Sequence, residues 1–123
     1  MLLTTLSLFG LTACQDSGNN ASYEQITPQQ AKTIMDTEGD YIIIDARTEE
    51  EFTEGHIEGA IMIPEYEIAE RAEKELPDKN ALILVYCRSG RRSKIASDEL
   101  VRLGYTNVKE FGGIIDWPYE VVK

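Results

Sequence analysis

The sequence predicts an α/β fold of three layers, in which helices cover both faces of a mostly parallel sheet. Short apolar segments typical of buried strands alternate along residues 23–123 with amphipathic segments of helical period. The apolar runs at 41–44 and 82–85 lack the polar alternation of a half-exposed strand, as expected of central strands. With 123 residues, the chain has room for one domain of ordinary size.

The first 22 residues lie outside the predicted domain, which spans residues 23–123. Residues 1–14 carry no charged side chain, are too short to span a bilayer, and end in Leu-Thr-Ala-Cys. They resemble a bacterial lipoprotein signal, although the usual basic residues before the apolar run are missing, and the resemblance implies that Cys14 is lipidated. Residues 15–22 are small and polar, which predicts a flexible tether. We therefore expect an extracytoplasmic lipoprotein anchored to a membrane, either periplasmic or on the outer face of the cytoplasmic membrane.

In the first half of the domain, cap and turn residues separate the expected elements. Residues 23–26 predict a short edge strand. A Thr-Pro pair then provides an N-cap and a first helical residue, and residues 28–37 carry an apolar face at helical spacing. The first central strand follows at 41–44. Thr48 and the three glutamates after it predict the start of a second helix, because acidic residues stabilise a first helical turn.

The second half continues the same alternation. A short strand over residues 60–63 stops at a proline, and a charged helix follows over 65–76. The second central strand at 82–85 leads into a helix over 94–103, and a last strand over 108–111 is ended by two glycines. The glutamates of the charged helix are spaced as on a solvated helix face, so we predict no metal site and no cofactor.

Cys87 lies where the second central strand meets the following helix. At such a turn, loop amides and the free N–H groups of the helix point at one spot and bind anions. The helix dipole, Arg88, Arg91 and Arg92 favour a charged thiolate there. Gly90 allows the loop to curl with a positive φ. We therefore predict that Cys87 is a nucleophile at neutral pH, and not merely a small buried apolar side chain.

Four segments, in order along the chain, resemble the rhodanese family. They are Cys-Arg-Ser-Gly-Arg-Arg-Ser at 87–93, a segment over 44–60 with Ile-Asp-Ala-Arg and Gly-His-Ile-Glu-Gly-Ala, Leu-Gly-Tyr at 103–105, and Gly-Gly-Ile to Trp at 112–117. The resemblance covers residues from about 23 to the end. It implies a rhodanese-like fold and sulfur transfer. In that chemistry the Cys87 thiolate takes a sulfane sulfur from a donor such as thiosulfate, becomes a persulfide, and passes the sulfur to cyanide or a thiol.

The resemblance also implies roles for other residues. It implies that the sulfur donor is bound by the residues of the loop, Arg88, Ser89, Gly90, Arg91, Arg92 and Ser93. Their backbone amides stabilise negative charge, and the arginine side chains attract the donor anion. We interpret Asp45 and Arg47, at the end of the first central strand, as a structural pair that fixes the segment rather than as a catalytic acid. His56 is likewise interpreted as structural, since a thiolate stabilised by amides and arginines needs no general base.

Two other functions compete with sulfur transfer. Phosphatases and arsenate reductases of the cell-cycle type share the fold and the cysteine, but their loop has five residues between cysteine and arginine. Here four residues separate Cys87 from Arg92, so the ring suits one sulfur atom better than a tetrahedral oxyanion. The second alternative is a non-catalytic interaction module, since some rhodanese-like domains have lost the cysteine, whereas this chain keeps it.

Composition limits the partners. The net charge of -10 argues against nucleic acid, because binders of nucleic acid normally show a basic footprint. The one basic cluster, at 88–94, suits a small anion better than a polyanion. With two cysteines, one in the lipoprotein-like segment, we expect no structural disulfide. The predicted partners are thus a small sulfur-containing anion, a thiol or cyanide acceptor and a membrane surface, and we expect a monomer.

Overall fold

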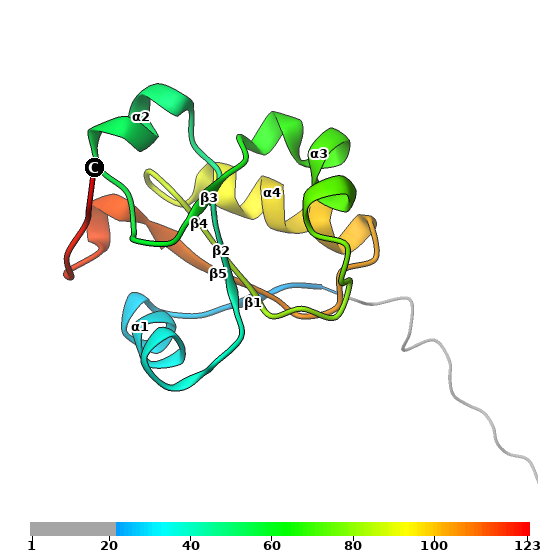
Figure 1. The fold of residues 1–123 in the computed structure, drawn as a ribbon, viewed down its shortest axis with the longest axis horizontal. Coiled ribbons are helices and arrows are strands. Elements are labelled where there is room, and N and C mark those ends of the chain that lie inside the picture. Colours follow the sequence, from blue (N-terminus) through cyan, green and yellow to red (C-terminus); the bar gives the residue numbers. More distant parts are fainter. Residues whose placement is uncertain (1–21) are drawn as a thin grey trace, which may run out of the picture.

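A five-stranded sheet forms the centre of residues 22–123, which are the part of the chain that the computed structural model describes (Figure 1). The strand order is β1-β5-β4-β2-β3, and each neighbouring pair is parallel. The strands are β1 (Glu24–Gln25), β2 (Ile42–Asp45), β3 (Ile61–Met62), β4 (Ile83–Cys87) and β5 (Val108–Gly113). The two outer strands, β1 and β3, have only two residues each.

Helices cover both faces of this sheet, as predicted (Figure 1). They are α1 (Pro28–Thr37), α2 (Glu49–Glu54), α3 (Ile68–Glu75) and α4 (Arg91–Arg102), with 3₁₀ turns η4 (Glu65–Glu67) and η5 (Ile114–Asp116). One apolar core includes Val85 of β4, Ala72 of α3 and Leu100 of α4. A second apolar core lies on the other face and includes Ala31 of α1 and Leu84, the residue before Val85, because successive strand residues point to opposite faces. The three-layer α/β fold is therefore confirmed.

Two helices begin with the caps that the sequence predicts. Thr27 accepts a hydrogen bond from the backbone N–H of Gln30 (3.0 Å), and the Gln30 side chain accepts one from the Thr27 N–H (2.9 Å). Thr48 and Glu51 form the same reciprocal pair at the start of α2. Each reciprocal pair is a capping box, and it satisfies two backbone N–H groups that the start of a helix leaves without partners.

The charged helix predicted over 65–76 is shorter than expected. Its first turn is the 3₁₀ segment η4, and Glu67 then adopts φ -110° and ψ 0°, outside the helical region. No side chain caps α3, which begins at Ile68. The chain leaving Pro64 therefore turns once tightly before the α-helix starts.

The loop predicted over 88–93 is also shorter than expected, because α4 begins at Arg91. Gly90 adopts φ 108°, a left-handed conformation that side chains rarely tolerate, and this lets the chain reverse within three residues. Arg91, Arg92 and Ser93 therefore form the first turn of α4 rather than a loop.

The last strand continues through the two glycines that we expected to end it. Gly113 of β5 pairs with Cys87 of β4, after a register shift between Val85 and Cys87. A Cβ at Gly113 would lie 2.1 Å from the Arg88 carbonyl oxygen. Glycine at this position therefore allows β5 to continue beside the Cys87 loop, where any side chain would clash with the loop backbone.

Cys14, the predicted signal over residues 1–14 and nearly all of the predicted tether over 15–22 lie outside the described residues, so these predictions stay open. Within residues 22–123, no helix has the length and apolar character needed to cross a membrane.

Candidate active site

Cys87 is the last residue of β4 and is a free, buried cysteine with 1% of its surface exposed. The backbone N–H of Gly90 donates to its Sγ atom over 3.0 Å. The Ser93 hydroxyl lies 3.3 Å from the same sulfur. Both groups belong to the segment that the sequence predicts as the donor-binding loop. The left-handed φ of Gly90 lets the chain pass directly from this loop into α4.

Helix α4 points its N-terminus at the same place. Arg91 and Arg92 open a helix of 12 residues, whose first amides have no partners within the helix. The partial positive charge at such an end stabilises a nearby anion. The site can therefore hold negative charge on sulfur with backbone groups alone.

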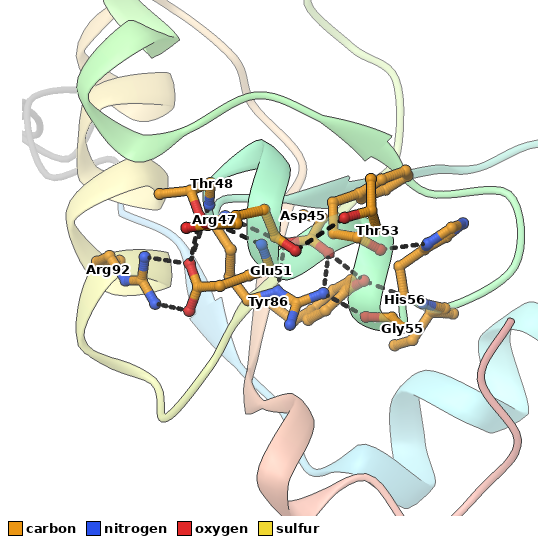
Figure 2. Close-up of polar contacts among 12 residues, drawn as sticks. Asp45, Arg47, Thr48, Glu51, Thr53, Gly55, His56, Tyr86 and Arg92 are labelled. Carbon is orange, nitrogen blue, oxygen red and sulfur yellow. Dashed lines mark hydrogen bonds and ion pairs between the residues drawn. The ribbon is translucent and has the colours of Figure 1, made fainter. Parts of the chain in front are cut away.

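The three loop arginines do not share one role. Arg88 and Arg91 are exposed to solvent, whereas Arg92 makes a two-pronged ion pair with Glu51, with both N–O distances 2.8 Å (Figure 2). Hydrogen bonds from Arg92 and from Thr48 hold the pKa of Glu51 at about 2, although its partial burial acts in the opposite direction. Arg92 thus links α4 to α2, while Arg88 and Arg91 are the cations open to an approaching anion.

Asp45 and Arg47 form a buried pair beside the strand ends. The Arg47 guanidinium donates to both Asp45 carboxylate oxygens (2.9 and 2.7 Å) and to the Gly55 carbonyl (2.7 Å) (Figure 2). The Tyr86 hydroxyl donates to Asp45 (2.6 Å) and accepts from the Ile57 N–H (3.0 Å). Burial, with the Asp45 charge adding, raises the pKa of Tyr86. This network ties β2 and β4 to the chain after α2, an arrangement that fits the structural role expected of the pair.

His56 follows α2 and lies against it. Its ring stacks on Phe52 with centroids 3.7 Å apart, and its Nδ1 atom lies 2.8 Å from the Phe52 carbonyl oxygen. Its backbone exchanges two hydrogen bonds of 2.8 Å with Val122. Among the hydrogen bonds of the described residues, none joins His56 to Cys87. These contacts fasten the end of the chain to α2, and they accord with a structural role.

Sequence reasoning missed the buried carboxylate of Glu110. This residue of β5 is 1% exposed, and its Oε2 atom accepts hydrogen bonds from Ser93 Oγ (2.5 Å) and from the Gly112 N–H (2.9 Å). Glu110 shares its sheet face with Val108, two residues earlier. The alternation of strand residues therefore places position 110 in the core, and a glutamate at a core position was the sequence signal that could have revealed this group.

A surface cavity of about 690 Å³ lies away from the cysteine. Tyr41, Trp117 and Tyr119 contribute to its walls beside α1, and neither Cys87 nor its loop lines it. Within residues 22–123, no three His, Cys, Asp or Glu side chains are placed to hold a metal ion.

Comparison with known proteins agrees with this geometry. The family model described as "Rhodanese-like domain" matches residues 27–118. The chain is 42% identical over 80 residues to thiosulfate sulfurtransferase PspE of Escherichia coli, covering 65% of this chain and 77% of that protein. It is 32% identical over 104 residues to adenylyltransferase and sulfurtransferase UBA4 of Candida albicans, where it covers 79% of this chain but only 24% of the relative.

A solved structure shows the same likeness in three dimensions. The structure described as "rhodanese with anions from E. coli" superposes with a TM-score of 0.64 at 41% sequence identity, covering 68% of this chain and 98% of the other. The match of the family model extends over most of the chain, from the Thr27 cap to Pro118, and includes Cys87 and its loop. The chain therefore belongs to the rhodanese-like domain family.

Proposed function

We propose that the protein is a sulfurtransferase that carries sulfane sulfur on Cys87, with thiosulfate as a donor and cyanide or a thiol as the acceptor. One observation carries this proposal: the Cys87 sulfur accepts a backbone N–H at the N-terminus of a 12-residue helix. That environment favours the thiolate, which is the nucleophilic form of cysteine. The names of two relatives, thiosulfate sulfurtransferase PspE and adenylyltransferase and sulfurtransferase UBA4, support the same activity.

The reaction has two covalent steps. The Cys87 thiolate attacks the outer sulfur of thiosulfate, a bond forms between the two sulfur atoms, and sulfite leaves with the electron pair of the broken bond. The acceptor then attacks the outer sulfur of the persulfide, and Cys87 leaves as thiolate. The exposed Arg88 and Arg91 attract the donor anion, while the Gly90 N–H and the first amides of α4 stabilise charge on the persulfide.

Intact mass spectrometry tests the proposal directly. Incubation with thiosulfate should add one sulfur atom to the wild-type chain, and cyanide should remove it and yield thiocyanate. Cys87→Ser should stay folded, because serine is slightly smaller than cysteine, and should gain no sulfur. An unmodified wild-type mass after thiosulfate would favour a non-catalytic interaction module instead.

The phosphatase alternative has a separate test. The chain turns within the three residues Arg88–Gly90, and the Gly90 amide already contacts Sγ at 3.0 Å. So tight a ring leaves little room to align a phosphoryl group with the sulfur. We expect no Cys87-dependent hydrolysis of an aryl phosphate. Turnover of such an ester at a rate rivalling thiosulfate would overturn the assignment.

We also propose attachment to the outer side of the cytoplasmic membrane or a periplasmic membrane surface through lipidated Cys14. The support is the Leu-Thr-Ala-Cys sequence before a polar segment. Fractionation of wild type and Cys14→Ser tests this proposal, and only the wild type should stay with the membranes. Stable attachment needs at least two acyl chains. Equal partition of both proteins into the soluble fraction would exclude the anchor.

A further inference from the structure

The carboxyl group of Glu110 lies directly behind the nucleophile, one hydroxyl away. Its Oε2 atom is 2.5 Å from Ser93 Oγ, and Ser93 Oγ is 3.3 Å from Cys87 Sγ. All three side chains are buried, with exposures of 1% for Glu110 and Cys87 and 0% for Ser93. The thiol, the hydroxyl and the carboxyl group therefore form a continuous chain of hydrogen-bonding atoms shielded from water.

The Ser93 hydroxyl has one hydrogen and several acceptors within reach. Besides Glu110 and Cys87, the carbonyl oxygens of Gly90 (3.1 Å) and Gly112 (3.5 Å) surround it. A carboxylate is the strongest acceptor of this set, so an ionised Glu110 holds the Ser93 hydrogen. The Ser93 oxygen then turns a lone pair toward the sulfur and accepts a hydrogen bond from the Cys87 thiol. A protonated Glu110 reverses both bonds, and Ser93 donates to a Cys87 thiolate.

The charges around Glu110 favour a single anion in this chain of groups. From the strand β1, Gln25 offers only an amide N–H, 3.4 Å from Oε1. Burial raises the pKa of Tyr23, next along that edge, and the carboxylates of Asp98 and Glu110 add to the effect. Neither residue supplies a positive charge to Glu110.

The nearby cations have other partners. On α4, the Lys94 ammonium contacts the Gly90 carbonyl (3.3 Å) and Arg92 pairs with Glu51. On β5, Lys109 pairs with Glu24. Among the ion pairs of the described residues, none includes Glu110. A carboxylate and a thiolate together would therefore place two buried anions side by side, which is costly without a cation.

We propose that Glu110 stores the thiol proton of Cys87 while the protein carries sulfur, and that Ser93 relays it. This inference rests on the proposed sulfur transfer. Before the Cys87 sulfur attacks thiosulfate, the thiol proton passes to Ser93 Oγ and the Ser93 proton passes to Glu110, which leaves the Cys87 thiolate that attacks. The products are the persulfide anion, sulfite and a neutral Glu110 carboxylic acid. The summed charge of cysteine and glutamate is -1 before and after the step, so these two buried side chains never carry a negative charge at the same time.

Discharge of the sulfur reverses the transfer. When cyanide or a thiolate removes the outer sulfur, Cys87 leaves as a thiolate, and the proton on Glu110 returns to it through Ser93. Glu110 does not touch substrate, so it is a positioning residue that sets the protonation state of the nucleophile.

Infrared difference spectroscopy tests the stored proton in the wild-type protein. Loading with thiosulfate should produce the C=O stretch of a buried carboxylic acid, and cyanide should remove it. Glutamate labelled with heavy carbon in its carboxyl group should shift the band. Cys87→Ser should show no band. Glu110→Gln should load with sulfur but show no band, because Gln keeps an oxygen for the Gly112 N–H and cannot take up a proton. Persulfide formation without the band in wild type would overturn the relay while leaving sulfur transfer intact.

Alkylation of Cys87 by iodoacetamide gives a readout that is independent of sulfur transfer. Below neutral pH, Glu110→Gln and Ser93→Ala should each lower the alkylation rate about tenfold or more, and the double variant should be no slower than the slower single variant, since both break one relay. At alkaline pH, where solvent removes the thiol proton, all rates should converge. Faster alkylation of Glu110→Gln than of wild type at low pH would show that the carboxylate only repels the thiolate, and would refute the relay. Thermal unfolding of each variant confirms that it is folded.

Discussion

Replacement of Gly113 by alanine should damage both the stability of the protein and the reactivity of Cys87. A Cβ at this position would lie 2.1 Å from the Arg88 carbonyl oxygen, 2.5 Å from the Arg88 carbonyl carbon and 2.5 Å from the Ser89 Cα. All three are backbone atoms, so no side-chain rotation relieves the clash. Either β5 or the loop must move, and the hydrogen bond from the Ile115 N–H to the Arg88 carbonyl (3.2 Å) would be lost with it.

The expected loss is large for a single methyl group. Overpacking usually costs about 1–3 kcal/mol and a lost hydrogen bond about 1 kcal/mol, so we expect about 3 kcal/mol in the free energy of unfolding. Urea unfolding followed by fluorescence of Trp117, the single tryptophan, measures it. Gly39→Ala is the matched control, because a Cβ there meets nothing within 4 Å and the change should be within about 0.5 kcal/mol. Equal midpoints for Gly113→Ala and wild type would refute the reasoning, as would unchanged iodoacetamide reactivity of Cys87.

Three further substitutions test the groups around the site by unfolding and activity assays. Glu51 has a folded pKa of about 2, below its ordinary value of 4.5, so its stabilising contribution is present above about pH 4.5 and is lost as the pH falls toward 2. Glu51→Gln should lower the free energy of unfolding by about 1 kcal/mol at neutral pH, since solvent screens the pair. It should also weaken the fall in stability between about pH 4.5 and 2, and an unchanged fall would contradict this reasoning. His56→Ala should cost about 1–2 kcal/mol through the lost ring stack, and a folded variant with sulfur transfer down about 100-fold would show instead a catalytic role. Tyr86→Phe leaves the buried Ile57 N–H without its acceptor and should lower stability by about 1–3 kcal/mol, and a neutral result would mean that Asp45 or another group replaces the hydroxyl.

The order of strands and helices could be predicted from the sequence because each element carries its own local pattern. The uninterrupted apolar run of β4 marks a strand covered on both faces, and the Thr27 cap marks the start of α1. The position of Cys87 at the end of β4 follows from the same run. Such patterns need only neighbouring residues.

Contacts between distant segments could not be predicted in this way. In the sequence, Arg92 is one of three cations of the loop, but its partner Glu51 is 41 residues away and meets it only in the folded chain. Glu110 and Ser93 are 17 residues apart and meet only through the packing of β5 against the start of α4. The length of β5 depended on the close approach of Gly113 to the loop, a tertiary feature that a Gly-Gly pair cannot reveal by itself.

The two-residue strands at the edges of the sheet affect how readily the protein aggregates at high concentration. An outermost strand exposes unpaired N–H and C=O groups that can template the addition of a strand from another molecule. Here β1 and β3 offer only two residues of ladder each, and Pro28 and Pro64 follow them closely. The long strands β4 and β5, which would make better templates, have neighbours on both sides. The sheet is therefore protected against edge-to-edge aggregation, a property of value to any protein held at high local concentration.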